Sequence, residues 1–360
     1  MKIALVHDDL IQWGGAERVF LEISNLFPDA PIYTLAFDKN NPLLKSKFKN
    51  KDIRTSVLQK IPLYQFLYKP SFLLHPILFE QFDFSEYDLV ISHTSRFAKA
   101  IITKPQTTHI SYVHTPPRFI WNFSDGETSI FIKLFLPYLR FFDQICAKRV
   151  DYFLAGSENA KKRIENIYSL PSQVLYPFVD IKKFQNYECF DGGYYLVIAR
   201  LNKYKKIDIV IDTFNKLNKP LKVIGVGPEK ENLKSKAKSN IDFLENVPEE
   251  LLFNIIAGCR GLIVAAEEDF GLTALEAQAM GKPVIAYKGG GNLETVVDGK
   301  TGIFFEKQTI ESLSLAVKDF EERQFKKEDM IANAKKFSLK SFQDNLVKII
   351  RNFHALKSVD

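Results

Sequence analysis

Two glutamates on either side of a glycine turn are the residues of this chain best placed to do chemistry. Glu268 and Glu276 lie eight positions apart, with Gly271 between them. The stretch Leu272–Met280 is rich in helix formers and stops at Gly281. Glu268 is therefore expected just before a helix N-terminus, and Glu276 about two turns into the helix. A carboxylate beside free backbone N–H groups suits a site that binds hydroxyls and phosphates together. The alternative is a solvated loop carboxylate followed by an ordinary helix-surface carboxylate.

Two cations follow the first strand expected in the second half of the chain. Arg200 and Lys205 come directly after the strand Tyr194–Ala199. The carboxyl ends of parallel strands form the edge at which open sheets bind ligands. A guanidinium and an ammonium at that edge can neutralise a diphosphate without a metal ion. The alternative is a pair of surface charges at the start of an ordinary helix.

The sequence also carries a prediction about metals. It contains no Asp-x-Asp, and its six histidines form no ligand cluster. We therefore expect chemistry that does not depend on a metal ion.

Glycines and one histidine mark further candidate positions. Gly14 and Gly15 precede an expected helix, where they let backbone N–H groups approach an anion closely, although a plain turn and helix cap would also need them. Gly227 belongs to a Gly-x-Gly after a strand, a hint of a dinucleotide fingerprint, but Lys230 occupies the place of the third glycine. That substitution argues against an oxidoreductase. His114 ends an expected buried strand, a place where a lone histidine is more often structural.

The elements that must position these residues are short apolar strands alternating with helical patterns. Such alternation predicts an α/β protein with parallel, doubly wound sheets. An irregular stretch near 177–193, which ends in a glycine pair, predicts a boundary between two domains. The expected strands are Lys2–Val6, Pro31–Leu35, Asp88–Ser92, Thr108–His114, Asp151–Gly156 and Gln173–Tyr176, then Tyr194–Ala199, Leu221–Gly225, Ile241–Leu244, Gly261–Ala265, Pro283–Tyr287 and Gly302–Phe305.

Five segments, in this order, resemble glycosyltransferase family 4, the retaining transferases of the GT-B fold. They are MKIALVHDDLIQWGGAERVFLEI, YYLVIARLNKYKKIDIVIDTFNKL, KVIGVGPEKENLK, EEDFGLTALEAQAMGKPVIAY with its E-x7-E spacing, and GGGNLETVVDGKTGIFF. The resemblance implies two Rossmann-like domains facing across a cleft. It places an acceptor-binding domain at 1–180, a nucleotide-sugar-binding domain at 181–337, and a C-terminal helix at 338–360 that crosses back to the first domain.

The resemblance also implies roles for single residues. Arg200 and Lys205 would neutralise the donor diphosphate, Glu268 would bind hydroxyls of the donor sugar, and Glu276 would bind the ribose hydroxyls. His114 would hydrogen-bond a sugar hydroxyl or the transferring oxygen. The remaining donor-binding positions are backbone sites at Gly14, Gly15, Gly227, Phe270, Gly271, Leu272 and Thr273.

The run HTPPRFIW, which begins at His114, resembles a branch of the family that contains bacterial O-antigen mannosyltransferases. This favours a GDP-mannose donor, a glycan or lipid-linked acceptor in cell-surface polysaccharide synthesis, and no cofactor. UDP-sugar donors stay open because fold does not fix the sugar. A nucleotide-sugar 2-epimerase and a non-catalytic nucleotide-binding subunit are the alternatives from other classes.

Composition bounds the rest. The chain has 360 residues, of which 46% are hydrophobic, and this is enough to form two hydrophobic cores. Its net charge is +6. Three scattered cysteines, no signal peptide and no apolar run of about 20 residues lead us to expect a cytoplasmic protein. Two basic-aromatic stretches, 39–82 and Ser129–Arg149, suit peripheral contact with anionic lipid at the inner face of the cell membrane. Core helices covered by lysine side chains would give the same pattern. The spread of basic residues among apolar ones does not suggest nucleic acid.

Overall fold

The structure is a computed structural model that describes residues 1–68, 70–121, 130–245 and 247–357. The chain divides into two compact units. The first unit comprises Met1–Tyr176 together with Gln343–Asp360, and the second comprises Pro177–Phe342. Ser129, the first residue of the second basic-aromatic stretch, and residues 358–360 of the expected C-terminal helix lie outside the described residues.

The first unit is built on a parallel seven-stranded sheet of order β3-β2-β1-β4-β5-β6-β7. Its strands are β1 (Ile3–His7), β2 (Ile32–Thr34), β3 (Ile53–Thr55), β4 (Leu89–Thr94), β5 (Thr108–Val113), β6 (Tyr152–Ala155) and β7 (Ser172–Val174). Its helices are α1 (Gly15–Leu26), α2 (Pro42–Lys47), α3 (Tyr64–Tyr68), α4 (His75–Glu80), α5 (Arg118–Trp121), α6 (Ile130–Ala147) and α7 (Glu158–Tyr168), with 3₁₀ turns η1 (Val57–Lys60), η2 (Pro70–Leu74) and η3 (Ala98–Ala100).

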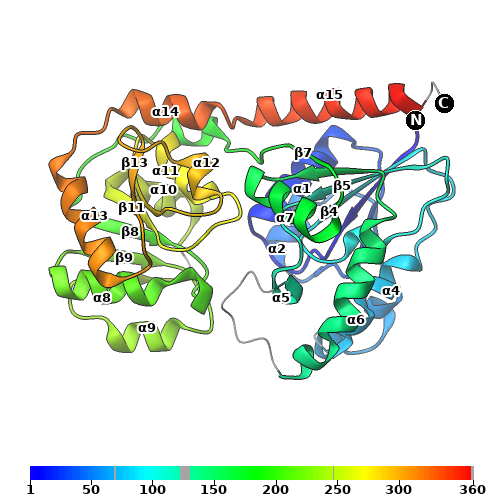
Figure 1. Cartoon of the computed structure of the whole chain (residues 1–360), viewed down its shortest axis with the longest axis horizontal. Coiled ribbons are helices and arrows are strands. Elements are labelled where there is room, and N and C mark those ends of the chain that lie inside the picture. The colour runs from blue at the N-terminus through cyan, green and yellow to red at the C-terminus, as the bar shows by residue number, and fades with distance from the viewer. Residues whose placement is uncertain (69, 122–129, 246, 358–360) are drawn as a thin grey trace. The chain divides into compact units, whose positions relative to one another are not determined.

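Strand alternation sends successive side chains of the first sheet to opposite faces. Val6 of β1 belongs to the core that includes Phe79 of α4 and Leu139 of α6. The next residue, His7, stacks instead on Phe20 of α1, with ring centroids 4.5 Å apart. Helix α1 therefore covers the face of the sheet opposite to α4 and α6, and both sets of helices can be followed in Figure 1.

The second unit has a parallel six-stranded sheet of order β10-β9-β8-β11-β12-β13. Its strands are β8 (Tyr194–Ile198), β9 (Leu221–Ile224), β10 (Ile241–Leu244), β11 (Cys259–Val264), β12 (Val284–Tyr287) and β13 (Gly302–Phe305). Its helical elements are η4 (Ile181–Phe184), η5 (Lys203–Lys205), α8 (Ile207–Leu217), α9 (Lys230–Lys236), α10 (Glu249–Gly258), α11 (Leu272–Ala279), α12 (Asn292–Thr295), α13 (Ile310–Glu322) and α14 (Lys327–Lys335).

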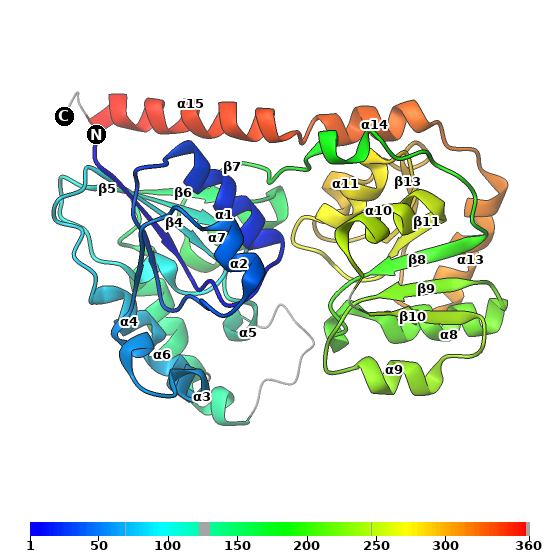
Figure 2. The same cartoon turned by 180° about the vertical axis from the view of Figure 1, so that it is seen from behind.

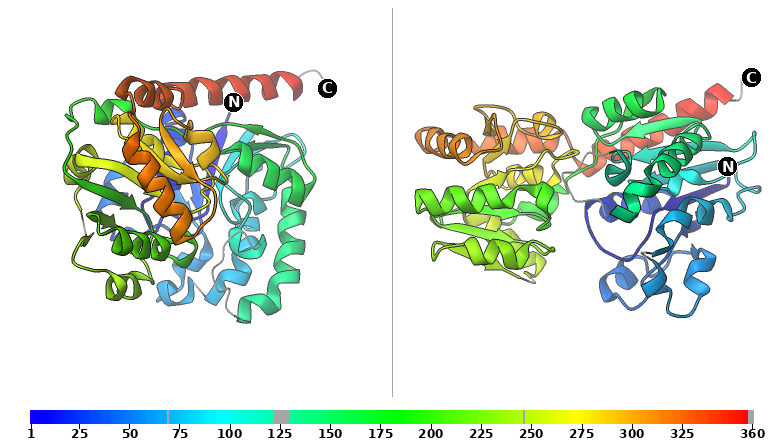
Figure 3. Two further views of the ribbon diagram at one scale, coloured as in Figure 1. Left: turned by 60° about the vertical axis from the view of Figure 1, so that its left-hand side comes forward. Right: turned by 60° about the horizontal axis from the view of Figure 1, so that its bottom comes forward.

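Helices cover the second sheet on both faces. Helices α8 and α13 lie side by side, and their buried residues share one core with β8, β9 and β13 (Figures 1 and 3). Helix α11 packs against α14, and the two are seen close together in Figure 2. Thr309 begins α13 because its side chain accepts the N–H of Ser312.

The last helix, α15 (Leu339–Lys357), belongs to both units by sequence. Its first residues fall in the second unit, and the residues from Gln343 onward group with the first. There Phe353 stacks on Tyr152 of β6, with ring centroids 3.8 Å apart and an interplanar angle of 14°.

The predicted fold class, α/β with two doubly wound parallel sheets, is confirmed. Every predicted strand has a counterpart, but β3 was not predicted. It is three residues long, and Lys51 and Asp52 precede it, so the segment carries no apolar run. The segment forms a strand because it pairs in parallel with β2, and this pairing is not indicated by its own sequence.

Candidate active site

Lys205 and Glu268 meet at the carboxyl edge of the second sheet. The Nζ atom of Lys205 lies 2.6 Å from each carboxylate oxygen of Glu268. Their side chains are 14% and 19% exposed, so the pair is partly shielded from water and still reachable by a ligand. The two residues follow β8 and β11, which are neighbours in the sheet although 63 positions separate the side chains in sequence.

Arg200 lies on the same loop as Lys205, and its side chain is exposed. The loop that follows β9 holds the backbone next to Arg200 through two hydrogen bonds. The N–H of Leu201 donates to Val226 O at 2.9 Å, and the N–H of Glu229 donates to Leu201 O at 3.0 Å. A Cβ atom at Gly227 would clash with the backbone of Leu201. The predicted donor-binding glycine therefore has a structural reason of its own: it lets the loop after β9 pack directly on the Arg200 segment.

The glycine-rich segment that follows β12 packs against the backbone of the Glu268 loop. The N–H of Gly291 donates to Glu268 O at 2.8 Å. A Cβ atom at Gly291 would collide with the backbone of Asp269 and Phe270. The buried ring of Phe270 in turn contacts Phe337 at a centroid distance of 5.4 Å. Direct backbone packing thus fixes where Glu268 stands.

Helix α11 begins immediately after this loop. Gly271 precedes it with φ +103°, in the left-handed region that favours glycine. Leu272 and Thr273 form the first turn, whose N–H groups have no acceptor within the helix. Glu276 is partly buried and is the fifth residue of α11, so it lies just over one turn into the helix. The predicted depth of about two turns was therefore too large, because α11 begins at Leu272.

Glu245 follows β10, the edge strand of the same sheet. It is held by Lys230 at 2.6 Å and Lys234 at 2.7 Å, and hydrogen bonds from the two ammonium groups lower its pKa to about 2. The carboxylate is thus tied to α9 on the surface of the second unit.

In the first unit, Gly14 and Gly15 stand at the start of α1. Gly14 caps the helix in an extended conformation, and its carbonyl accepts the N–H of Arg18 at 3.1 Å. The neighbouring Trp13 ring lies under Lys47, whose Nζ is 5.9 Å from the ring centroid. The two glycines therefore act as a helix start, with a cation and an aromatic ring beside it.

His114 directly follows β5 at the carboxyl edge of the first sheet and is partly buried. Its Nε2 lies 2.9 Å from Nε2 of His93, and Nδ1 of His93 lies 3.0 Å from Nδ1 of His7. Three neighbouring strands, β1, β4 and β5, thus end in a line of three imidazoles.

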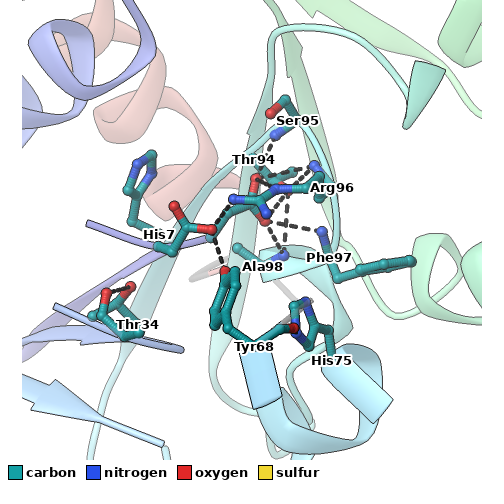
Figure 4. Close-up of polar contacts among 12 residues, drawn as sticks. His7, Thr34, Tyr68, His75, Thr94, Ser95, Arg96, Phe97 and Ala98 are labelled. Atoms are coloured by element: carbon teal, nitrogen blue, oxygen red, sulfur yellow. Dashed lines mark hydrogen bonds and ion pairs between the residues drawn. The ribbon is translucent and has the colours of Figure 1, made fainter. Parts of the chain in front are cut away.

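A second polar cluster occupies the carboxyl ends of β1 and β4 (Figure 4). The carboxylate of Asp8 accepts the hydroxyl of Thr94 and the backbone N–H groups of residues 95–98, all at 2.8–3.0 Å. Burial opposes the ionisation of Asp8, but Arg96, His7 and these hydrogen bonds outweigh it and lower its pKa. Asp8 thereby shapes the loop that follows β4.

Asp9 continues this cluster. One of its oxygens accepts from the Tyr68 hydroxyl and from the Arg96 guanidinium. Burial raises the pKa of Tyr68, with Asp9 adding to the effect, so the hydroxyl stays a donor. The other oxygen, Oδ1, is buried and has no hydrogen-bond partner in the part of the chain that the structure describes.

Asp8, Asp9 and Arg96 were not predicted from the sequence. Their signal was available: charged residues end two strands, in VHDD and in ISHTSR, where parallel strands present ligand-binding edges. The adjacency of β1 and β4, which joins the two signals, cannot be read from one sequence.

The HTPPRFIW segment is anchored through its last residue. The indole Nε1 of Trp121 donates to Asp143 Oδ2 at 2.8 Å, and the Tyr168 hydroxyl donates to the same oxygen at 2.7 Å. The other oxygen of Asp143 pairs with Lys99, and both side chains are buried. A guanidinium from Arg140 covers the Trp121 ring at 5.4 Å.

Within the described ranges, no group of three or more His, Cys, Asp or Glu side chains has the geometry to hold a metal ion. Over the same ranges, none of the helices combines the length and the apolar character needed to cross a bilayer.

Comparison with known proteins identifies the class. Residues 13–183 match the model of "Glycosyltransferase Family 4", and residues 180–337 match that of "Glycosyl transferases group 1". Together the two matches cover most of the chain, which therefore belongs to this glycosyltransferase family. The predicted enzyme class, a hexosyltransferase of family 4, is confirmed.

One relative matches over nearly the whole length and another over part of it. The alpha-1,3/1,6-mannosyltransferase ALG2 of Dictyostelium discoideum is 23% identical, with 98% of each chain covered. The GDP-mannose-dependent alpha-(1-6)-phosphatidylinositol monomannoside mannosyltransferase of Mycolicibacterium smegmatis is 29% identical over 38% of this chain and 40% of its own.

Solved structures confirm the GT-B fold. The lipopolysaccharide outer core galactosyltransferase WaaB superposes with a TM-score of 0.69 at 18% identity, covering 98% of this chain and 99% of its own. The sucrose-phosphate synthase of Thermosynechococcus elongatus gives a TM-score of 0.75 at 14% identity, covering 99% and 100%.

Proposed function

We propose that this chain is a retaining, metal-independent mannosyltransferase. It takes mannose from GDP-mannose and moves it to a glycan or lipid-linked acceptor at the cytoplasmic face of the membrane. The observation that carries the proposal is the Lys205–Glu268 pair, 2.6 Å apart, with the exposed Arg200 on the same loop. The names of the two mannosyltransferase relatives support mannose as the sugar and GDP as the carrier.

The site supplies what departure of a diphosphate requires. Two negative charges develop on the leaving group, and donors placed where charge develops are the largest single source of catalysis. Arg200 offers a planar fork of N–H donors, Lys205 offers a point charge, and the first turn of α11 offers backbone N–H groups. These groups neutralise the diphosphate without a metal ion.

Glu268 has two tasks in this scheme. Without donor, it compensates the Lys205 ammonium, so the site does not hold an isolated cation. With donor, the diphosphate takes over that compensation and the carboxylate turns to the sugar hydroxyls. The acceptor oxygen then attacks the anomeric carbon on the face from which the diphosphate leaves, and Glu276 binds the ribose hydroxyls.

Donor choice is tested by thermal-shift titration in EDTA against GDP, GDP-mannose, UDP and UDP-glucose. A ligand that binds only the folded state stabilises it by about 2.7 kcal/mol at 100 times its Kd. We expect stabilisation by GDP and GDP-mannose, loss of most of it in Arg200→Ala, and none lost in the matched surface control Lys216→Ala. Selective stabilisation by UDP would reject GDP-mannose as the donor. Conversion of the donor sugar without an acceptor would instead indicate an epimerase.

We also propose that the first unit touches anionic lipid through α3 and α6. Phe66 of α3 and Leu134 of α6 are each 75% exposed, and Lys60 of the preceding η1 and Lys133, next to Leu134 in sequence, are exposed cations. Apolar side chains among lysines are the composition of an interfacial surface. Sedimentation with vesicles of phosphatidylglycerol should decrease in Phe66→Ser and Leu134→Ser. It should not decrease in Leu315→Ser, which removes a leucine that is 67% exposed from the second unit. Failure of the unaltered protein to sediment would reject this contact.

A further inference from the structure

Asn292 is a fully buried asparagine at the start of α12, in the glycine-rich segment that follows β12. Its Nδ2 donates to the carbonyl oxygen of Ala266 at 2.8 Å and to that of Tyr287 at 2.9 Å. These carbonyls lie beyond Val264 and Ala286, the last paired residues of β11 and β12. One side chain therefore joins the carboxyl ends of two neighbouring strands at the point where their backbone pairing has ended.

The chemistry of the two acceptors fixes the orientation of the Asn292 amide. Backbone carbonyls only accept hydrogen bonds, so the amide atom that faces both of them is the nitrogen, which carries two hydrogens. The amide oxygen in that place would face two other oxygens. In the part of the chain that the structure describes, Oδ1 has no hydrogen-bond partner. A Cβ atom at Gly271 would lie 3.6 Å from it, so the amide also packs beside the start of α11.

The loop that these hydrogen bonds hold is the one that carries Glu268. Glu268 follows Ala266 by two residues, and its carbonyl oxygen accepts the N–H of Gly291, the neighbour of Asn292, at 2.8 Å. The loop is thus attached at positions 266 and 268 to one short segment. Its carboxylate meets Lys205, which follows the neighbouring strand β8, with both oxygens 2.6 Å from Nζ. This contact requires the loop to stay in one place.

We propose that Asn292 is a positioning residue for Glu268. Its two hydrogen bonds fix the loop after β11 so that the Glu268 carboxylate meets Lys205 and, with donor bound, the sugar hydroxyls. The inference rests on the proposed sugar transfer for the role of Glu268. Without the amide, two buried carbonyls lose their partner and the loop shifts to satisfy them. A misplacement of about 1 Å can cost about 100-fold in rate, so a kcat loss of about tenfold is expected in Asn292→Ala.

Asn240 provides a matched control at the opposite edge of the same sheet. It directly precedes β10, and its Nδ2 also donates to two backbone carbonyls, those of Phe214 at 3.1 Å and Lys219 at 2.7 Å. Within the described residues its Oδ1 likewise has no hydrogen-bond partner. Asn240→Ala therefore removes the same set of hydrogen bonds at the amino edge of the sheet. It should lower the stability of the unit and leave the Glu268 loop unchanged.

The first test is hydrogen–deuterium exchange of the full chain, followed in peptides that cover 265–275. Exchange there should rise by about tenfold in Asn292→Ala and stay unchanged in Asn240→Ala, because loss of a local contact opens only its own segment. Asn292→Asp keeps the shape of the side chain but, when ionised, has no hydrogen to donate, so it should behave like Asn292→Ala. It also serves as the test if the alanine variant does not fold.

Unchanged exchange at 265–275 in the Asn292 variants would overturn the proposal. This measurement needs neither donor nor acceptor, so its failure is distinguishable from failure of the proposed function.

The second test is a double-mutant cycle on the kcat for transfer. Asn292→Ala should lower kcat by about tenfold in the unaltered protein and by less than about twofold in Glu268→Gln, because residues that act through one another are not additive. Asn240→Ala should leave kcat unchanged. An equal fold loss in both backgrounds, or no loss in either, would overturn the positioning role, since a side chain that only stabilises the unit does not depend on Glu268.

Discussion

Replacing Asp143 by asparagine removes one charge from a fully buried ion pair and keeps an oxygen for its two other partners. Asp143 and Lys99 are 0% and 1% exposed. After the substitution the Lys99 ammonium keeps the carbonyl of Arg96 as an acceptor at 3.0 Å, but it has no counter-charge. Tyr168 and Trp121 can still donate to the amide oxygen.

The expected loss follows from this geometry. Removing one partner of a buried pair costs about 3–5 kcal/mol, because the remaining charge stays desolvated and uncompensated. The double variant Lys99→Met/Asp143→Asn leaves no charge and conserves volume, so it should lose only about 1–2 kcal/mol. The double variant should therefore be more stable than Asp143→Asn alone by about 2 kcal/mol.

Urea unfolding followed by tryptophan fluorescence measures this directly. Both tryptophans, Trp13 and Trp121, belong to the first unit, so the signal reports on the unit that contains the pair. The surface control Asp52→Asn breaks a pair whose side chains are 56% and 49% exposed and should lose at most about 1 kcal/mol. A loss in Asp143→Asn no larger than that of Asp52→Asn, or a double variant less stable than the single one, would refute the reasoning.

Three further predictions concern acid stability and the donor loops. Burial lowers the pKa of His75 and His109 to about 4. In the unfolded chain the histidine pKa values are about 6.5, so between about pH 6.5 and 4 the unfolded chain binds more protons than the folded protein. As the pH is lowered through that window, the free energy of unfolding should therefore fall by up to about 3 kcal/mol per histidine. Gly227→Ala places a methyl group against backbone, so it should lose about 1–3 kcal/mol of stability and weaken nucleotide binding. Glu268→Gln frees the Lys205 ammonium from its counter-charge, so GDP should bind at least as tightly while transfer falls by about tenfold or more.

Each of these has its own check. Equilibrium unfolding at several pH values, with His109→Gln as the comparison, should show a smaller loss between pH 6.5 and 4 in the variant. An identical slope would contradict the assignment to His109. Calorimetric titration with GDP separates the other two: Gly227→Ala should raise the Kd and Glu268→Gln should not. Weaker GDP binding in Glu268→Gln would show that the carboxylate supports the nucleotide rather than restraining the lysine.

Much of the fold could be predicted because its signals are local. Short apolar strands such as β4 and β5, each followed by a helix or a turn, predict a parallel sheet. The exception is β3, where pairing with β2 overrides a sequence without an apolar run. Boundaries failed by a residue or two at strand ends, where only hydrogen bonding decides.

The site was predictable only as separate pieces. The positions of Arg200, Lys205 and Glu268 at strand ends follow from sequence, but the contact between Lys205 and Glu268 depends on β8 lying beside β11. In the same way, the imidazole line of the first unit depends on the order β1-β4-β5. Strand order is set by long-range packing, and no local pattern in a single sequence encodes it.

The most direct test of the central claim is transfer of radiolabel from GDP-mannose to lipid-linked glycans in a membrane extract, with EDTA present throughout. We expect labelled, organic-soluble product with GDP-mannose, little with UDP-glucose, and a loss of about 100-fold or more in Arg200→Ala. Lys216→Ala should match the unaltered protein. Equal product formation with and without the Arg200 side chain, or a requirement for a divalent metal ion, would reject metal-independent mannosyl transfer assisted by Arg200.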